Sequence, residues 1–286
     1  MKRSMRAELA KQTVTIIERG SYTAPSGRDV DLAESVRACL AGTRFWTPEE
    51  LEVLRIRQPG RPTGNHAATL EVANETTLAG VTRLLAGGAG PVAALNFASA
   101  KNPGGGFLNG SHAQEESLAR SSALYASQLT AWEFYESHRR SPSLLYSDAI
   151  VVSPDCPVLR DDDGALLEMP YPVTFLTSAA PNAGAAADTR PHELPLIPET
   201  LRRRSEYVLA LAASQGCRRL VLGAWGCGVF RNDPEVVAAA FAGHLVRGAW
   251  AGQSDRVVFS VLDSSPKLGT ISAFERAFGD TAGGPS

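Results

Sequence analysis

Short apolar runs alternate with amphipathic segments along most of this chain. Continuous apolar runs predict strands that are buried on both faces, and apolar residues at three- to four-residue spacing predict helices. The predicted strands are residues 69–72, 92–97, 149–152, 173–177, 219–222 and 257–262. The predicted helices are residues 76–85, 117–127, 199–214, 234–246 and 270–278. This alternation predicts an α/β fold, a three-layer α/β/α sandwich.

The first 65 residues follow a different pattern. Helical spacing of apolar residues predicts a helix over residues 5–19, and a Pro-Ser-Gly turn predicts two short strands within residues 22–32. Thr47-Pro48-Glu49-Glu50 provides the cap, first-turn proline and capping-box acid of a helix that ends near residue 54. We therefore expect residues 1–65 to form a mostly helical extension packed on a main domain of residues 66–280. The Gly/Pro-rich tail, residues 281–286, is predicted to be disordered.

Composition narrows the classes of partner. A formal net charge of −2 gives no global basic field for nucleic acid or anionic membranes, and Arg202-Arg203-Arg204 is interpreted as a solvated helix face. The four scattered cysteines include no C-x-x-C pair, which argues against structural zinc and a disulfide framework. The sequence has no signal-peptide pattern and no apolar run of membrane-spanning length. We expect a cytoplasmic protein that binds neither membrane nor general nucleic acid; the pattern specifies no oligomeric state.

The first candidate site follows the predicted strand 92–97. Gly104-Gly105-Gly106 is separated by seven residues from Gln114-Glu115-Glu116, which opens the predicted helix 117–127. Glycines adopt positive φ and allow backbone N–H groups to approach a ligand, and paired carboxylates suit acid–base chemistry. Two simpler explanations stay open: a tight turn also needs glycine, and a helix N-terminus favours acids through its dipole.

A second glycine-rich segment, residues 223–232, lies between the predicted strand 219–222 and the helix that begins at Pro234. Loops at the carboxyl ends of strands bind anions in α/β sheets. Phe230 would cover a sugar or base there, or else be a core side chain. Cys227 has no histidine nearby in sequence, so we expect its thiol to pack rather than act as a nucleophile.

A third segment, residues 178–184, should reach the same rim, although turn chemistry at Pro181-Asn182 explains it equally well. Neither glycine-rich segment matches G-x-G-x-x-G or the P-loop. Two glycine-rich loops at one rim, one of them with paired acids, suit a diphosphate held by backbone amides. The acids would then act on a group attached to that diphosphate.

The triple glycine, seven-residue spacer and Gln-Glu-Glu resemble the signature of poly(ADP-ribose) glycohydrolases. Further segments resemble the microbial, bacterial-type branch of that family: residues 95–103, 153–154, 157–161, 179–182 and 223–232. This resemblance implies a macrodomain fold, with a mixed central sheet between helical layers and ADP-ribose in a cleft at one rim. It also implies hydrolysis of a ribose C1″–O bond without a metal or other cofactor.

The resemblance also assigns roles to residues. Glu116 would be the catalytic acid/base, Glu115 would bind the hydroxyls of the ribose being released, and Gln114 would help to hold the loop. The substrate-binding residues would be Asn102, Gly104, Gly105, Gly106, Gly226, Cys227, Gly228, Val229 and Phe230. The glycines would pack against the ribose and diphosphate, and Phe230 against the ribose. An acid that donates a proton near neutral pH needs a raised pKa, which burial and the neighbouring Glu115 are suited to provide.

Three functions fit these residues. The first is an exo-acting poly(ADP-ribose) glycohydrolase. The second is a mono-ADP-ribosyl hydrolase that acts on modified acidic side chains of proteins or on nucleic-acid bases. The third is a non-catalytic reader that binds ADP-ribose or ADP-ribosylated macromolecules. The paired acids argue against the reader, because binding alone does not need Glu116.

Overall fold

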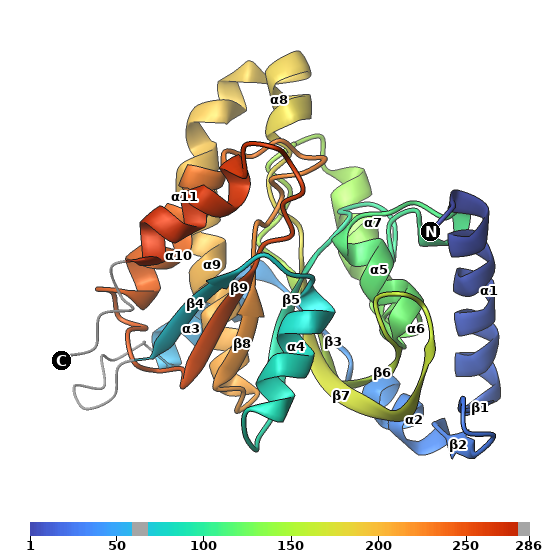
Figure 1. Ribbon diagram of the computed structural model, residues 1–286. Coiled ribbons are helices and arrows are strands. Elements are labelled where there is room, and N and C mark those ends of the chain that lie inside the picture. Colours follow the sequence, from blue (N-terminus) through green and yellow to red (C-terminus); the bar gives the residue numbers. More distant parts are fainter. Residues whose placement is uncertain (59–67, 280–286) are drawn as a thin grey trace.

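A computed structural model describes residues 1–58 and 68–279. Its centre is a seven-stranded mixed sheet of order β3-β6-β7-β5-β8-β9-β4 (Figure 1). The strands are β3 (Arg44–Trp46), β4 (Thr69–Ala73), β5 (Val92–Phe97), β6 (Ile150–Arg160), β7 (Leu166–Ser178), β8 (Arg219–Leu222) and β9 (Arg256–Ser260). All neighbours from β7 to β4 pair in parallel, whereas β6 runs antiparallel to β7 and β3. A separate hairpin joins β1 (Ser21–Thr23) and β2 (Asp29–Asp31).

Helices cover both faces of the sheet. The described helices are α1 (Arg3–Arg19), α2 (Ala33–Gly42), α3 (Pro48–Arg57), α4 (Thr77–Ala86), α5 (Gln114–Ser121), α6 (Leu124–Thr130), α7 (Trp132–Arg140), α8 (Ala183–Thr189), α9 (Ile197–Ser214), α10 (Pro234–Leu245) and α11 (Gly269–Phe278). Two 3₁₀ helices accompany them, η1 (Phe107–Asn109) and η2 (Pro191–Leu196). The mixed sheet between helical layers confirms the predicted three-layer fold.

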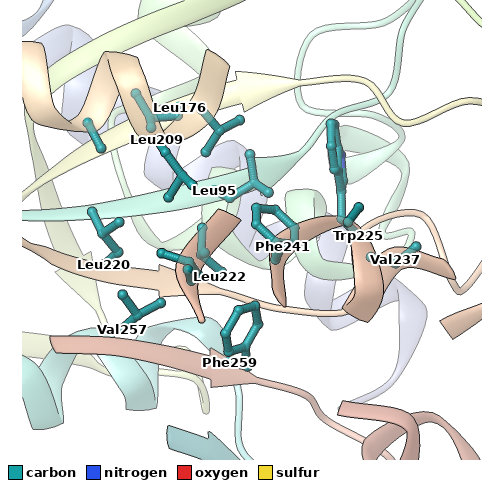
Figure 2. Close-up of a cluster of buried hydrophobic side chains, with 14 of the residues drawn as sticks. Leu95, Leu176, Leu209, Leu220, Leu222, Trp225, Val237, Phe241, Val257 and Phe259 are labelled. Carbon is teal, nitrogen blue, oxygen red and sulfur yellow. The ribbon is translucent and has the colours of Figure 1, made fainter. Parts of the chain in front are cut away.

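Alternate residues of each central strand pack into two different hydrophobic cores, one on each face of the sheet. On β5, Ala93 and Leu95 belong to the core shared with α9, α10 and α11, whereas Val92 and Ala94 belong to the core shared with α1, α2 and α4. Figure 2 shows the first of these cores, which contains Leu95, Leu220 and Leu222 of the sheet and Phe241 of α10. Because both faces are buried, the strands are continuous apolar runs, which is why the sequence revealed them.

Most predicted elements are confirmed, and several boundaries follow from caps. Thr47 and Glu50 form the predicted capping box at the start of α3. The predicted helix 117–127 is wrong, because two helices, α5 and α6, occupy this region. Ser122 between them has extended backbone and pairs with Val158 in an isolated bridge. The N–H of Ala123 donates to the carbonyl of Pro157, which also ends the helical hydrogen-bonding pattern.

Two strands are longer than the sequence predicted. The pairs of the β6–β7 hairpin run from Ile150–Ser178 to Arg160–Leu166 and include Pro157 opposite Pro172. Prolines inside a run argue against a strand, because they cannot donate to the ladder. A register shift between Ser153 and Cys156 leaves Pro154 out of the paired positions, whereas Pro157 and Pro172 face each other within the ladder.

The N-terminal region contributes directly to the sheet. Strand β3 pairs with β6 and forms one edge, so residues 44–46 belong to the central layer. The predicted boundary at residues 65–66 and the predicted disordered tail, residues 281–286, lie outside the described residues. No helix in the described part of the chain is long and apolar enough to span a membrane.

The interpretation of Arg202-Arg203-Arg204 as a solvated face is wrong for its last member. Arg204 is buried, 1% exposed, and pairs with Asp148 at 2.7 Å. Its guanidinium also donates to the carbonyls of Ala179 and Leu145. This arginine therefore ties the segment before β6 to the segment after β7.

Candidate active site

The three segments singled out in the sequence meet at one rim of the sheet. Strand β5 runs parallel to both β7 and β8, so the loops that follow these strands leave at the same edge. A Cβ on Gly223 would lie 3.1 Å from the ring of Phe97, and a Cβ on Gly226 would lie 2.6 Å from Cβ of Ala180. The second and third segments therefore pack on each other beside the end of β5.

The loop that contains Gly104, Gly105 and Gly106 is the glycine loop, residues 98–110. Gly104 and Gly105 have φ of +63° and +58°, a region that residues with side chains rarely adopt. The N–H of Gly104 donates to Oε1 of Gln128 (2.7 Å), that of Gly105 to the carbonyl of Asn102 (3.0 Å), and that of Gly106 to Oε1 of Glu116 (3.0 Å). All three N–H groups thus have acceptors inside the protein.

The glycine loop also needs glycine for steric reasons. A Cβ on Gly105 would overlap Oε1 of Glu116 and lie 3.3 Å from Oε2 of Glu115. A Cβ on Gly106 would lie 2.5 Å from Oγ of Ser111. The bare backbone of Gly105 therefore lies directly against both carboxylates.

Glu116 is held in place by two backbone N–H groups. It is the third residue of α5 and half-buried. Its Oε1 accepts from Gly106 and its Oε2 accepts from the N–H of Ala113 (3.1 Å), the residue that precedes the helix. The second contact is the backbone half of a capping box, so Glu116 also stabilises the helix N-terminus. Glu116 therefore also has the role of an acid at a helix N-terminus, and its contact with Gly106 is additional to that role.

Glu115 is almost completely buried, 3% exposed, and both of its oxygens are hydrogen-bonded. Oε2 accepts from the N–H of Ser99 (2.6 Å), and Oε1 accepts from Nδ2 of Asn96 (3.1 Å) and Nε2 of Gln128 (2.9 Å). Burial raises the pKa of Glu115 to about 8, although these three hydrogen bonds favour the charged form and oppose the rise. The motif alone did not indicate this raised pKa of Glu115.

Gln114 anchors the start of α5 to the end of β5. Its Oε1 accepts from the N–H of Phe97 (2.8 Å), and its Nε2 donates to the carbonyl of Leu95 (2.8 Å) and to Oγ1 of Thr77 (3.1 Å). The side chain therefore completes the hydrogen bonding of the strand end. This geometry makes Gln114 a residue that positions both acids.

Sequence reasoning did not identify three partners of Glu115: Asn96, Ser99 and Gln128. Asn96 carried a signal, because it is the polar member of the apolar run 92–97 and is fully buried. A buried polar side chain requires partners, so such a residue deserves notice. Gln128 carried no signal, because its role depends on the turn between α5 and α6.

The second loop, residues 226–230, has unused hydrogen-bond donors. Gly226 has φ of +73°, and a side chain there would overlap the amide of Asn232. That amide donates to the carbonyl of Pro181 (2.8 Å), which holds the second loop against the third segment. Within the described residues, the N–H groups of Gly228, Val229 and Phe230 form no hydrogen bond. Backbone N–H groups that are free and adjacent suit an anion.

The remaining predicted site residues lie around these two loops. Phe230 is half-buried, with its ring centroid 5.9 Å from that of Tyr146. Burial raises the pKa of the Cys227 thiol to about 12, consistent with packing rather than nucleophilic attack. Asn102 is exposed, and its Oδ1 accepts from Arg139 at 3.4 Å.

A pocket of about 570 Å³ is lined by residues that follow the second loop in the chain, and by none of the loop itself. It lies between the start of α10, at Asp233 and Pro234, and the segment that leads from Ser265 into α11 at Thr270. The described residues contain no cluster of three or more histidine, cysteine or acidic side chains arranged for a metal.

Comparison with known proteins places this arrangement in a family. The model of the microbial-type PARG catalytic domain matches residues 10–161, more than half of the chain. The structure of poly(ADP-ribose) glycohydrolase (PARG) from Thermomonospora curvata is 51% identical, with a TM-score of 0.91, over 96% of this chain and 100% of that chain. The same enzyme has been solved bound to the inhibitor ADP-HPD, at 51% identity and the same coverage, with a TM-score of 0.89.

A PARG from Deinococcus radiodurans in complex with ADP-ribose is 47% identical, with a TM-score of 0.81, over 88% of this chain and 99% of that chain. A comparison with curated proteins gives no significant match. These likenesses confirm the macrodomain-like fold expected from the sequence. The chain belongs to the microbial-type poly(ADP-ribose) glycohydrolase family.

Proposed function

We propose that this protein hydrolyses poly(ADP-ribose) at the ribose C1″–O bond and releases ADP-ribose from the chain end. The observation that carries the proposal is the Glu116 carboxylate, fixed by the N–H of Gly106 against the bare backbone of Gly105. The complexes of two relatives support poly(ADP-ribose) as the substrate: the Thermomonospora enzyme binds the inhibitor ADP-HPD, and the Deinococcus enzyme binds ADP-ribose.

Binding would use the groups that the protein leaves open. The free N–H groups of Gly228, Val229 and Phe230, counted within the described residues, would hold the diphosphate. Glu115 Oε2 accepts one hydrogen bond, from Ser99, and a carboxylate oxygen has two lone pairs. When the carboxyl is protonated, the proton at this remaining position of Oε2 would donate to a hydroxyl of the terminal ribose, which orients that sugar beside Glu116.

Glu116 would carry out the proton transfers. Cleavage of a glycosidic bond passes through an oxocarbenium-like transition state, in which the leaving oxygen needs a proton. Glu116 donates that proton and, as the carboxylate, then activates the attacking water. Such acid–base assistance typically contributes about 10²–10⁴-fold in rate. The diphosphate oxygens supply negative charge close to the developing cation.

The environment of Glu115 limits the charge at this site. With a pKa of about 8, the Glu115 carboxyl keeps its proton over much of the neutral range. If both carboxyl groups were ionised, the two negative charges beside Gly105 would repel each other. A neutral Glu115 therefore allows Glu116 to be charged when it activates water.

The test offers purified protein poly(ADP-ribose), a mono-ADP-ribosylated acidic peptide and ADP-ribose. We expect single ADP-ribose units to be released from the polymer, and Glu116→Gln to lose at least about 100-fold in rate. Glutamine can still accept from Ala113 and cap the helix, so this variant should remain folded and should still bind ADP-ribose.

Other outcomes would select other functions. Release of ADP-ribose from the peptide with the polymer left intact would identify a mono-ADP-ribosyl hydrolase. Binding of ADP-ribose without hydrolysis by the wild type would identify a reader. An unchanged rate in Glu116→Gln would remove Glu116 from the mechanism.

A further inference from the structure

One exposed side chain of the glycine loop and two of α7 form a cationic and aromatic patch that the proposed binding of the released ADP-ribose does not use. It consists of Lys101, Trp132 and Arg139, and we call it the α7 patch. Trp132 is 44% exposed although it is a large aromatic residue. The guanidinium carbon of Arg139 lies 4.6 Å from the centroid of the Trp132 ring, so the two side chains stack in the open.

A short series of contacts connects this patch to the carboxylates. Oε2 of Glu115 accepts from the N–H of Ser99, and Oγ of Ser99 accepts from the N–H of Asn102 at 3.2 Å. Oδ1 of Asn102 then accepts from Arg139 at 3.4 Å. Lys101 precedes Asn102 in the chain. Three hydrogen bonds in series therefore connect the α7 patch to Glu115.

The α7 patch and the second loop lie on opposite sides of β5. The second loop follows β8, on one side of β5 in the sheet order. Helix α7 packs through Phe134 and Tyr135 on Ala149 and Val151, at the start of β6, on the other side of β5. Figure 1 shows α7 next to α5 and away from α10 and α11. If the second loop holds the ADP-ribose that is released, the leaving group departs toward α7.

The charge of the patch is available for a ligand. Within the described residues, neither Lys101 nor Arg139 forms an ion pair, whereas the adjacent Arg140 pairs with Glu136 at 2.8 Å. When the terminal ribose–ribose bond of poly(ADP-ribose) is cut, the leaving group is the remaining chain, and its nearest unit carries a diphosphate and an adenine. Arginine and lysine bind phosphates, and adenine stacks on exposed aromatic rings.

We propose that the α7 patch binds the ADP-ribosyl unit on the leaving-group side of the scissile bond. Its adenine stacks on Trp132, and its diphosphate contacts Arg139 and Lys101. This inference rests on the proposed function and adds to it, because it states what the enzyme recognises beyond the unit that it releases. The occupant is a nucleotide unit of the polymer, and a peptide leaving group is the alternative that the test addresses.

The test compares two substrates that differ only in the leaving group. One is poly(ADP-ribose), and the other is ADP-ribose with a small phenol at C1″, which departs readily and is too small to reach the patch. We expect Trp132→Ala and Arg139→Gln each to raise KM for the polymer about tenfold, the effect of losing one base stack or one phosphate contact. KM for the phenol substrate should change less than twofold.

Arg140→Gln is the matched control, because it removes an exposed arginine of the same helix that is already paired. It should not change the ratio of the two KM values. Equal effects of Trp132→Ala and Arg139→Gln on both substrates, or no effect on either, would overturn the proposal. So would a change in KM confined to an ADP-ribosylated acidic peptide, which would assign the patch to a protein leaving group.

The same assay separates this inference from the proposed function. If the wild type hydrolyses neither substrate, the glycohydrolase itself is wrong, and the patch proposal falls with it. If the wild type hydrolyses both and the variants keep the KM ratio of the wild type, the patch proposal alone is wrong. Trp132 and Arg139 are exposed, so thermal melting of both variants should match the wild type.

Discussion

At the scale of single residues, the site depends on the missing side chain of Gly105. The backbone there has φ of +58°, and it lies against the oxygens of both Glu115 and Glu116. Any Cβ would displace the two groups that the proposed reaction needs. The requirement for glycine is thus a requirement for contact with the acids, since the N–H of Gly105 itself bonds to the carbonyl of Asn102.

We expect Gly105→Ala to lower kcat/KM by at least about 100-fold, because a misplacement of about 1 Å at a catalytic group costs rates of this order. The control is Gly216→Ala, which has a similar φ of +70° but no atom within 4 Å of the new Cβ. Both variants carry the same backbone strain, of order 1 kcal/mol, but only the first disturbs the acids. Steady-state kinetics on the polymer would check this; equal activity in the two variants would contradict the steric role.

Glu115 should make folding stability depend on pH. Its pKa is about 8 in the folded protein and near the ordinary value of 4.5 in the unfolded chain. Between these values the folded state binds more protons, so this contribution is complete below pH 4.5 and is lost as pH rises through 8. Urea unfolding between pH 5 and 8 should show a decrease in stability for the wild type that Glu115→Gln lacks. Parallel pH profiles would exclude the shift.

The sequence predicted the two acids but could not supply the environment that distinguishes them. The motif places Glu115 and Glu116 side by side, with identical chemistry. They differ in the fold because Glu115 points at Asn96 and Gln128, whereas Glu116 points at Gly106. Gln128 is thirteen residues after Glu115, beyond a turn that no local pattern revealed.

At the scale of elements, predictions succeeded where burial alone determines the pattern. Strands β5 and β8 begin and end at the predicted residues, because both of their faces are covered by helices. The predictions failed where contacts with distant segments determine the backbone conformation. Helix α5 ends at Ser121 because Ser122 pairs with Val158, and β6 continues through Pro157, which is paired with Pro172 of β7. Neither effect is present in the local sequence.

Gln114 provides a test of how α5 is positioned. We expect Gln114→Ala to cost about 1–3 kcal/mol, because the buried N–H of Phe97 and carbonyl of Leu95 lose their partner. Helix α5 would also be free to shift, so kcat should fall more than KM rises. Urea unfolding and kinetics measure the two effects. The exposed Gln12→Ala should change stability by less than about 0.5 kcal/mol, and an equal loss in both variants would contradict the anchoring role.

At the scale of the whole molecule, the N-terminal helix supports the glycine loop from behind. Arg3 and Arg6 donate to the carbonyls of Asn109 and Gly110, where the loop ends. Phe107 of the loop is buried with Ala10 of α1. A side chain on Gly110 would overlap the carbonyl of Arg3. The N-terminal region is therefore part of the architecture that fixes the site.

We accordingly expect α1 to unfold together with the sheet, and Thr13→Val to reveal this coupling. Thr13 is 2% exposed; its hydroxyl donates to the carbonyl of Arg120 on α5 (2.6 Å) and accepts from Nε of Arg160 on β6 (3.0 Å). Valine keeps the shape but leaves both groups unpaired, at a cost of about 1–3 kcal/mol. Calorimetry should therefore show a single transition with a Tm lowered by several degrees, whereas the exposed Thr189→Val should not shift it. A separate, earlier transition in Thr13→Val would mean that α1 docks independently, and the glycine loop would then not depend on it.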